Sequence, residues 1–166
     1  VNPIVIVGTG RSGSTVLHRL LSKHPGLAWL TSVCNRRPEL PRANALILRA
    51  LDIPFASGIV RRLFAPLECY EFWEHYCPGF RRPCRDLSAS DLTERARRRL
   101  AAAFSRVGTA KRNRLLLKIT GWPRIGLLTQ LFPEAVFVHV KRDGRAVTNS
   151  VLNTEFWSGW GGPNNW

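Results

Sequence analysis

The chain has 166 residues, of which 45% are hydrophobic, and it carries a formal net charge of +14. This composition excludes an intrinsically disordered chain, and the length is sufficient for one domain with a hydrophobic core. No apolar run reaches the roughly 20 residues that span a bilayer, and the positive charge predicts anionic ligands such as nucleotides or sulfated and phosphorylated substrates.

The N-terminal part is typical of a strand, a glycine-rich turn and a helix. We predict a strand over residues 4–8, the turn GTGRSGST over residues 8–15 and a helix over residues 15–23. Such a turn directs several backbone N–H groups and a helix N-terminus at one point, which suits a phosphate group. The Gly-x-x-x-x-Gly spacing matches a nucleotide-binding P-loop, but Ser14 replaces the usual lysine and Arg11 supplies a cation inside the loop. The apolar residues that we expect on one face of the helix are Val16, Leu17, Leu20 and Leu21.

The rest of the chain alternates between strand and helix patterns. We predict strands over residues 27–30, 115–119 and 135–140, and helices over residues 44–51, 67–76, 90–107 (with Ser90 as N-cap), 123–131 and 145–153. This alternation predicts an α/β fold of the P-loop type, with a central parallel sheet between two layers of helices. We expect residues 1–166 to form a single nucleotide-binding domain that is incomplete at its C-terminus.

A second motif, KRDGRAVTNS, follows the predicted strand 135–140. Arg142 lies at the strand end and Ser150 lies eight residues later in the following helix. Ligands of parallel sheets bind at the carboxyl ends of the strands, so this motif and the glycine-rich turn can face one crevice. A guanidinium group can bind a phosphate through two hydrogen bonds. One alternative is that Arg142 pairs with Asp143 or another acidic neighbour and that Ser150 is only a helix residue. The other is that the glycine turn binds nothing and is simply capped by Ser14 or Thr15.

Together the two motifs resemble those of sulfotransferases that use 3′-phosphoadenosine 5′-phosphosulfate (PAPS). The first resembles their 5′-phosphosulfate loop, and the second resembles their 3′-phosphate motif, in which Arg and Ser have the same separation. The arginine-containing loop is closer to the bacterial, tyrosylprotein and carbohydrate branch than to the cytosolic branch with a His base. The resemblance implies transfer of a sulfuryl group from PAPS to an acceptor hydroxyl or amine, with adenosine 3′,5′-bisphosphate as product and no metal required.

The resemblance also implies roles for individual residues. Arg11 would stabilise charge on the bridging oxygen of the donor, and Arg142 with Ser150 would hold its 3′-phosphate. The residues implied to hold the 5′-phosphate are Ser12, Gly13, Ser14 and Thr15.

The catalytic base is not given by the family pattern. Cytosolic members carry Lys-x-His where this chain has Lys118-Ile119-Thr120, and tyrosylprotein-type members carry a Glu where residues 30–33 contain no carboxylate. A base needs hydrogen-bond reach to the acceptor and a suitable pKa. We take Glu68 as the first candidate and His75 as the second; the alternative is that these groups only decorate a helix. Lys118 either assists the leaving group or is paired structurally.

Two other functions fit the same motifs: an ATP-dependent P-loop kinase, and a basic polyanion-binding module with a degenerate loop. The acceptor is left open among carbohydrate, lipid, peptide and small molecule, and so is the oligomeric state. We expect no nucleic-acid partner, because no known nucleic-acid module accompanies the basic run at residues 97–99. The lack of paired cysteines favours the bacterial cytoplasm, with the Golgi lumen as the alternative if a membrane anchor was removed.

The cysteines are Cys34, Cys69, Cys77 and Cys84, and none belongs to a C-x-x-C pair. We predict buried free thiols; disulfides in a secretory protein, or a zinc site with His75, are the alternatives.

Overall fold

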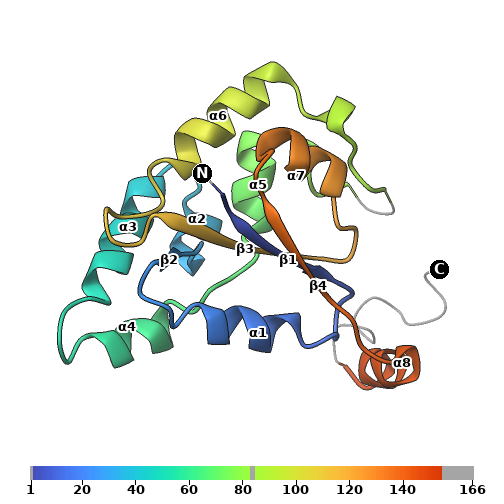
Figure 1. Ribbon diagram of the computed structural model, residues 1–166, viewed down its shortest axis with the longest axis horizontal. Helices are drawn as coiled ribbons and strands as arrows, with labels where there is room; N and C mark the ends of the chain where they lie inside the picture. Colours follow the sequence, from blue (N-terminus) through green and yellow to red (C-terminus); the bar gives the residue numbers. More distant parts are fainter. Residues whose placement is uncertain (1, 83–84, 155–166) are drawn as a thin grey trace.

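The computed structural model describes residues 2–82 and 85–154, which form an α/β fold around a parallel sheet (Figure 1). The strands are β1 (Ile4–Gly8), β2 (Leu27–Ala28), β3 (Arg114–Thr120) and β4 (Val136–Val140), in the order β2-β3-β1-β4. All three pairings are parallel. The predicted fold class is therefore confirmed. Cys84 lies outside the described residues, and so do four aromatic residues for which we predict no role: Phe156, Trp157, Trp160 and Trp166.

Helices cover both faces of this sheet. The helices are α1 (Ser14–Leu21), α2 (Ser32–Arg36), α3 (Pro41–Ala50), α4 (Ser57–Leu63), α5 (Tyr70–Tyr76), α6 (Glu94–Phe104), α7 (Ile125–Leu131) and α8 (Gly144–Leu152). In Figure 1, α1 lies on one side of the sheet and α5, α6 and α7 lie on the other. Among the described residues, no helix has the length and apolar character needed to cross a membrane.

Alternation along the central strand explains the layers. Successive strand side chains point to opposite faces, so Val5 and Val7 join the large core beneath α5–α7, whereas Ile6 joins a smaller cluster. Leu17 and Leu21 of α1 pack against that smaller cluster. The sheet is therefore buried on both faces, as its uninterrupted apolar strands predict.

The inner face of α1 differs from the expected apolar stripe. Val16 and Leu20 are 72% and 59% exposed, whereas Ser14 and His18 are buried. The helix lies on β3 and β1 through the stripe that contains His18, so only two of the four predicted apolar residues reach the core. Leu17 and Leu21 are those two.

The start of α6 also differs from the sequence prediction. Ser90 does not cap the helix; it lies in a short 3-10 turn, Ala89–Asp91, which Ser88 and Asp91 cap reciprocally. The α-helix begins at Glu94, where the side chain of Thr93 accepts a hydrogen bond from the amide of Ala96. Two capping signals follow each other closely here, and the second one starts the helix.

Three of the cysteines are buried free thiols, as predicted: Cys34, Cys69 and Cys77. Burial raises the pKa of the Cys34 thiol to about 12, so this thiol is not ionised at neutral pH. Within residues 2–82 and 85–154, no three His, Cys, Asp or Glu side chains are grouped as metal ligands.

Strand register places three strand ends at one level. Gly8, the last residue of β1, is paired with Thr120 of β3 on one side and with Val140 of β4 on the other. The backbones of β1 and β4 lie close together at this point, because a Cβ on Gly8 would lie 2.7 Å from the carbonyl oxygen of Val140. The glycine-rich turn therefore begins between the ends of its two neighbouring strands.

Candidate active site

The turn after β1 presents unpaired backbone amides. Gly13 has a φ of 97°, a left-handed conformation that favours glycine, and it precedes the first turn of α1. In the described structure, the amides of Gly13, Ser14 and Thr15 donate to no protein acceptor. Such amides at a helix N-terminus form a ready anion-binding position.

The hydroxyl groups of the turn are not equivalent. The Ser12 hydroxyl is buried without a hydrogen-bond partner and lies 3.2 Å from the position of a Cβ on Gly8. Ser14 is only 3% exposed, whereas Thr15 is exposed. The Ser12 side chain therefore lies inside the turn, and the phosphate-binding roles of Ser12 and Ser14 stay predictions.

The second motif is in direct contact with the first. Nη1 of Arg142 donates to the backbone carbonyl of Arg11 at 2.9 Å, and Nε of Arg11 donates to Oγ of Ser150, also at 2.9 Å. Arg11 itself has a φ of 64°, an uncommon backbone conformation for a residue with a side chain. The structure thus brings Arg11, Arg142 and Ser150 together across 139 residues of sequence.

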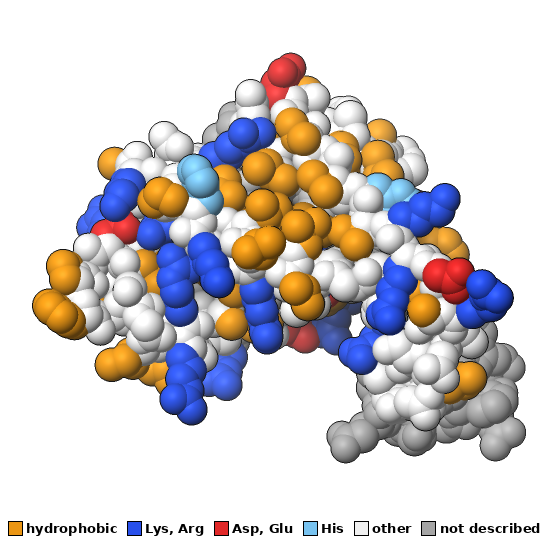
Figure 2. All heavy atoms as spheres, turned by 60° about the horizontal axis from the view of Figure 1, so that its bottom comes forward, with side chains coloured by type: hydrophobic (Ala, Val, Ile, Leu, Met, Phe, Trp, Pro, Cys, Tyr) orange, Lys and Arg blue, Asp and Glu red, His pale blue; other side chains and the backbone are white. Residues whose placement is uncertain are grey.

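Asp143 does not pair with Arg142, so that alternative is wrong. Its carboxylate instead caps α8 by accepting hydrogen bonds from the amides of Arg145 and Ala146. Figure 2 shows a notch on this side of the molecule, beside the lobe that contains α8, with Lys and Arg side chains along its rim.

A buried ion pair lies on the other side of the turn. Nζ of Lys118, in β3, is 2.6 Å from Oε1 of Glu68 and donates to Oγ1 of Thr15 at 2.8 Å. The Lys118 side chain is 7% exposed and that of Glu68 is 18% exposed. The hydroxyl of Thr120 donates to the second carboxylate oxygen of Glu68 at 2.8 Å. Lys118 thus joins the first turn of α1 to the candidate base.

The neighbours of Glu68 keep it ionised. Burial by itself would raise its pKa, but the hydrogen bond and positive charge of Lys118, together with the Tyr70 and Thr120 side chains, hold the pKa below its usual value. Tyr70 is adjacent: its hydroxyl donates to the carbonyl of Thr120, and burial raises its pKa to about 12. A carboxylate, rather than a phenolate, is therefore the proton acceptor available here at neutral pH.

His75, the second candidate base, is not part of this group. It lies near the end of α5, is exposed and stacks edge-on against Tyr76. A cavity of about 480 Å³ is instead lined by Thr15, Glu68 and Lys118, together with Arg19, Tyr70 and Arg81. This volume lies within the usual range for small-molecule sites, so the cavity can hold a substrate group beside Glu68.

The model of the family described as "Sulfotransferase family" matches residues 3–163 of the chain. The chain is a member of the sulfotransferase family. No curated protein and no solved structure gives a significant match. Membership of a sulfotransferase family is therefore confirmed, and with it sulfuryl transfer in general; the branch within the family and the PAPS donor stay predictions.

Only part of the site in this sulfotransferase is predictable from its sequence. The sequence indicated the two motifs and Glu68, but not that Lys118 bridges Glu68 and Thr15. One signal was present, since Lys118 is a charged residue within an otherwise apolar strand. Thr120, noted only as the residue that replaces a histidine, proves to be a hydrogen-bond donor to Glu68.

Proposed function

We propose that this sulfotransferase moves a sulfuryl group from PAPS to an acceptor hydroxyl or amine. The observation that carries the proposal is the convergence of Arg142 and Ser150 on Arg11, at the mouth of the glycine-rich turn. A donor with phosphate groups at both its 5′ and 3′ positions needs two anion-binding positions close together. ATP has no 3′-phosphate, so binding of ATP would not require the second anion-binding position.

The described residues fit such a donor. The unpaired amides of Gly13, Ser14 and Thr15 suit its 5′-phosphosulfate end. Arg142 and Ser150 suit its 3′-phosphate, since neither is committed to a carboxylate in the described structure. Bound there, PAPS would supply an activated sulfuryl group, and Arg11 would add positive charge between its two ends.

Glu68 is the proposed base, and Lys118 the proposed cation beside the transferred group. As the acceptor oxygen or nitrogen forms a bond to sulfur, the bond from sulfur to the 5′-phosphate oxygen breaks and the acceptor proton passes to Glu68. Lys118 both orients Glu68 and contacts Thr15 of the loop, so it stabilises negative charge on the donor side. Thr120, which replaces the histidine of the cytosolic branch, supports placing this enzyme outside that branch.

Ligand-dependent thermal stability tests the proposal, because a ligand that binds only the folded state raises the apparent Tm. Adenosine 3′,5′-bisphosphate without Mg²⁺ is expected to raise the Tm clearly, and ATP with Mg²⁺ to raise it much less. Transfer of labelled sulfate from PAPS to a panel of acceptors then tests the reaction itself. Equal shifts from the two nucleotides, or a larger shift from ATP, would contradict the proposal.

A further inference from the structure

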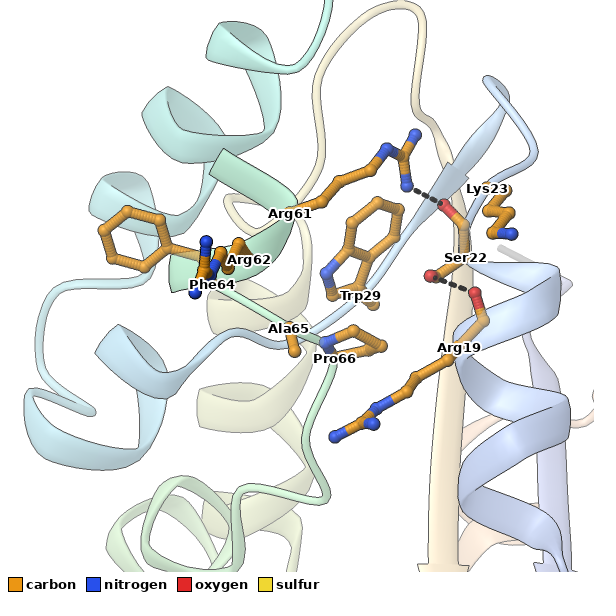
Figure 3. Close-up of a pocket in the computed structure, with 9 residues that line it drawn as sticks. All are labelled: Arg19, Ser22, Lys23, Trp29, Arg61, Arg62, Phe64, Ala65 and Pro66. Atoms are coloured by element: carbon orange, nitrogen blue, oxygen red, sulfur yellow. Dashed lines mark hydrogen bonds between the residues drawn. The ribbon is translucent and has the colours of Figure 1, made fainter. Parts of the chain in front are cut away.

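A second cavity, of about 300 Å³, lies at the far end of α1 (Figure 3). Its lining includes Arg19 and Lys23 from α1, Arg61 and Arg62 from α4, and Trp29, which follows β2. Figure 3 shows the Arg61 side chain extended over the indole ring towards Ser22, whose carbonyl accepts its hydrogen bond at 3.2 Å. Trp29 is itself buried, and it forms one wall of this cavity.

This basic cavity adjoins the candidate active site. Arg19 and Pro66 line both the basic cavity and the cavity that contains Glu68 and Lys118. Thr15 lies at the active-site end of α1 and Lys23 just beyond its other end. At a rise of about 1.5 Å per residue, these two positions are separated by about 12 Å along the helix axis. One extended molecule can therefore occupy both cavities.

The charge of the basic cavity is not balanced by its surroundings. Its lining holds four cationic side chains and no carboxylate. None of the four belongs to an ion pair in the part of the chain that the structure describes. The nearby Asp52 is already paired with Arg112 and Lys111. Burial and the charge of Arg112 lower the pKa of Arg61, which an anion bound in the cavity would counteract.

We infer that the acceptor already carries a carboxylate or sulfate group, as an acidic oligosaccharide does. This anionic group binds among Arg19, Lys23, Arg61 and Arg62, while the accepting hydroxyl lies beside Glu68. Guanidinium groups suit these ligands because they bind carboxylate and sulfate oxygens in pairs. The inference rests on the proposed function and specifies its acceptor.

An acidic peptide carries the same charges but fits the described surface less well. Extended peptides commonly bind by adding a strand to an exposed sheet edge. The edge strand on this side is β2, which has only two residues, both buried. The cavity therefore offers cationic side chains for recognition rather than a row of main-chain partners.

Charge reversal in the basic cavity tests the inference. The variant Lys23→Glu/Arg62→Glu changes two exposed side chains that make no described side-chain hydrogen bond, and it spares Arg61, which contacts Ser22. A matched control, Arg95→Glu/Arg106→Glu, makes the same change of net charge at two exposed residues on or just after α6, on the other side of the sheet. The probes are a tetrasaccharide of alternating uronate and hexosamine residues and its carboxyl-reduced, neutral form. Their binding is measured by calorimetry in the presence of adenosine 3′,5′-bisphosphate.

We expect the unmodified protein and the control variant to bind the acidic tetrasaccharide at least roughly tenfold more tightly than the neutral one. The Lys23→Glu/Arg62→Glu variant is expected to lose this preference while keeping its affinity for adenosine 3′,5′-bisphosphate. Equal binding of the two tetrasaccharides, or loss of the preference in the control variant as well, would overturn the inference. So would tighter, cavity-dependent binding of an acidic peptide. Failure of the protein to bind adenosine 3′,5′-bisphosphate would instead contradict the proposed function itself.

Discussion

The two sides of the glycine-rich turn are built differently. On the β3 side, Lys118 and Glu68 are largely buried and hold each other and Thr15 through short contacts. On the α8 side, Arg142 and Arg11 are exposed and connected by single hydrogen bonds. The β3 side is therefore held by buried ionic contacts, whereas the α8 side is held only by exposed hydrogen bonds. This contrast suits an enzyme whose reacting groups are fixed and whose donor must enter and leave.

The largest effect is expected when the carboxylate of the β3 side loses its charge. Glu68→Gln keeps the shape of the side chain but removes the proposed base, so kcat should fall roughly 10²- to 10⁴-fold. Affinity for adenosine 3′,5′-bisphosphate should stay close to that of the unmodified enzyme. Glu71→Gln is the matched control, because Glu71 lines the same cavity but is paired with Arg81. A Glu68→Gln enzyme as fast as the Glu71→Gln control would exclude Glu68 as the base.

The stability of the protein should also depend on the ion pair between Glu68 and Lys118. Removing Glu68 leaves the buried ammonium of Lys118 without its partner, so Glu68→Gln should lower the free energy of unfolding by roughly 3 kcal/mol. Lys118→Met/Glu68→Gln removes both charges and should recover much of that loss without recovering activity. Urea unfolding of the two variants measures the difference. If the double variant is less stable than Glu68→Gln, the pair does not interact as described.

The β3 side should also lose stability in acid through His18. Burial and the charge of Lys118 lower the pKa of His18 from 6.5 to about 4. Below pH 6.5 the unfolded chain therefore binds a proton that the folded protein excludes. The stability contributed by neutral His18 is complete above pH 6.5 and is lost as the pH falls towards 4, by roughly 3 kcal/mol in total. In urea unfolding at a series of pH values, His18→Gln should reduce the dependence of the free energy of unfolding on pH in this range. The same slope between pH 6.5 and 4.5 in the variant and the unmodified protein would contradict this role of His18.

A smaller effect on stability is expected from substitution of Gly8, which lies between the β3 side and the α8 side of the turn. Gly8→Ala would place a Cβ 2.7 Å from the carbonyl oxygen of Val140, which forces β4 to shift and should cost roughly 1–3 kcal/mol of stability. Gly10→Ala is the control within the same turn, because an added Cβ there meets nothing within 4 Å. Thermal unfolding should separate the two variants. Equal Tm values would show that β1 and β4 are not in tight contact at the strand ends.

Sequence reasoning was sufficient for the α/β fold and for most helices and strands, because apolar strands and amphipathic helices have clear local patterns. The start of α6 could not be predicted in this way, because neighbouring residues give competing capping signals. Ser88, Ser90 and Thr93 all resemble N-caps, and only tertiary packing decides among them. Spacing also could not show which stripe of α1 faces the sheet, where buried His18 replaces expected apolar contacts with Val16 and Leu20.

The site was predictable only as separate motifs. The turn and Arg142 each carry a local signal, but the contact of Arg11 with Ser150 joins residues that are 139 positions apart. Similarly, Glu68 and Lys118 lie 50 positions apart and meet only because the segment before α5 passes the end of β3. Chemistry-bearing residues were thus visible in the sequence, whereas their partners depended on the topology of the sheet.

Arg142 and Ser150 are proposed to form a second anion-binding position, which holds a 3′-phosphate. The most direct test is the Kd of adenosine 3′,5′-bisphosphate compared with that of adenosine 5′-monophosphate, measured for the unmodified enzyme, for Arg142→Ala and for the neighbouring control Lys141→Ala. We predict that the unmodified enzyme and the control prefer the bisphosphate by about 100-fold, as expected for charge-assisted hydrogen bonds, and that Arg142→Ala abolishes most of this preference. Equal affinity for the two nucleotides, or a preference that survives in a folded Arg142→Ala protein, would contradict the claim.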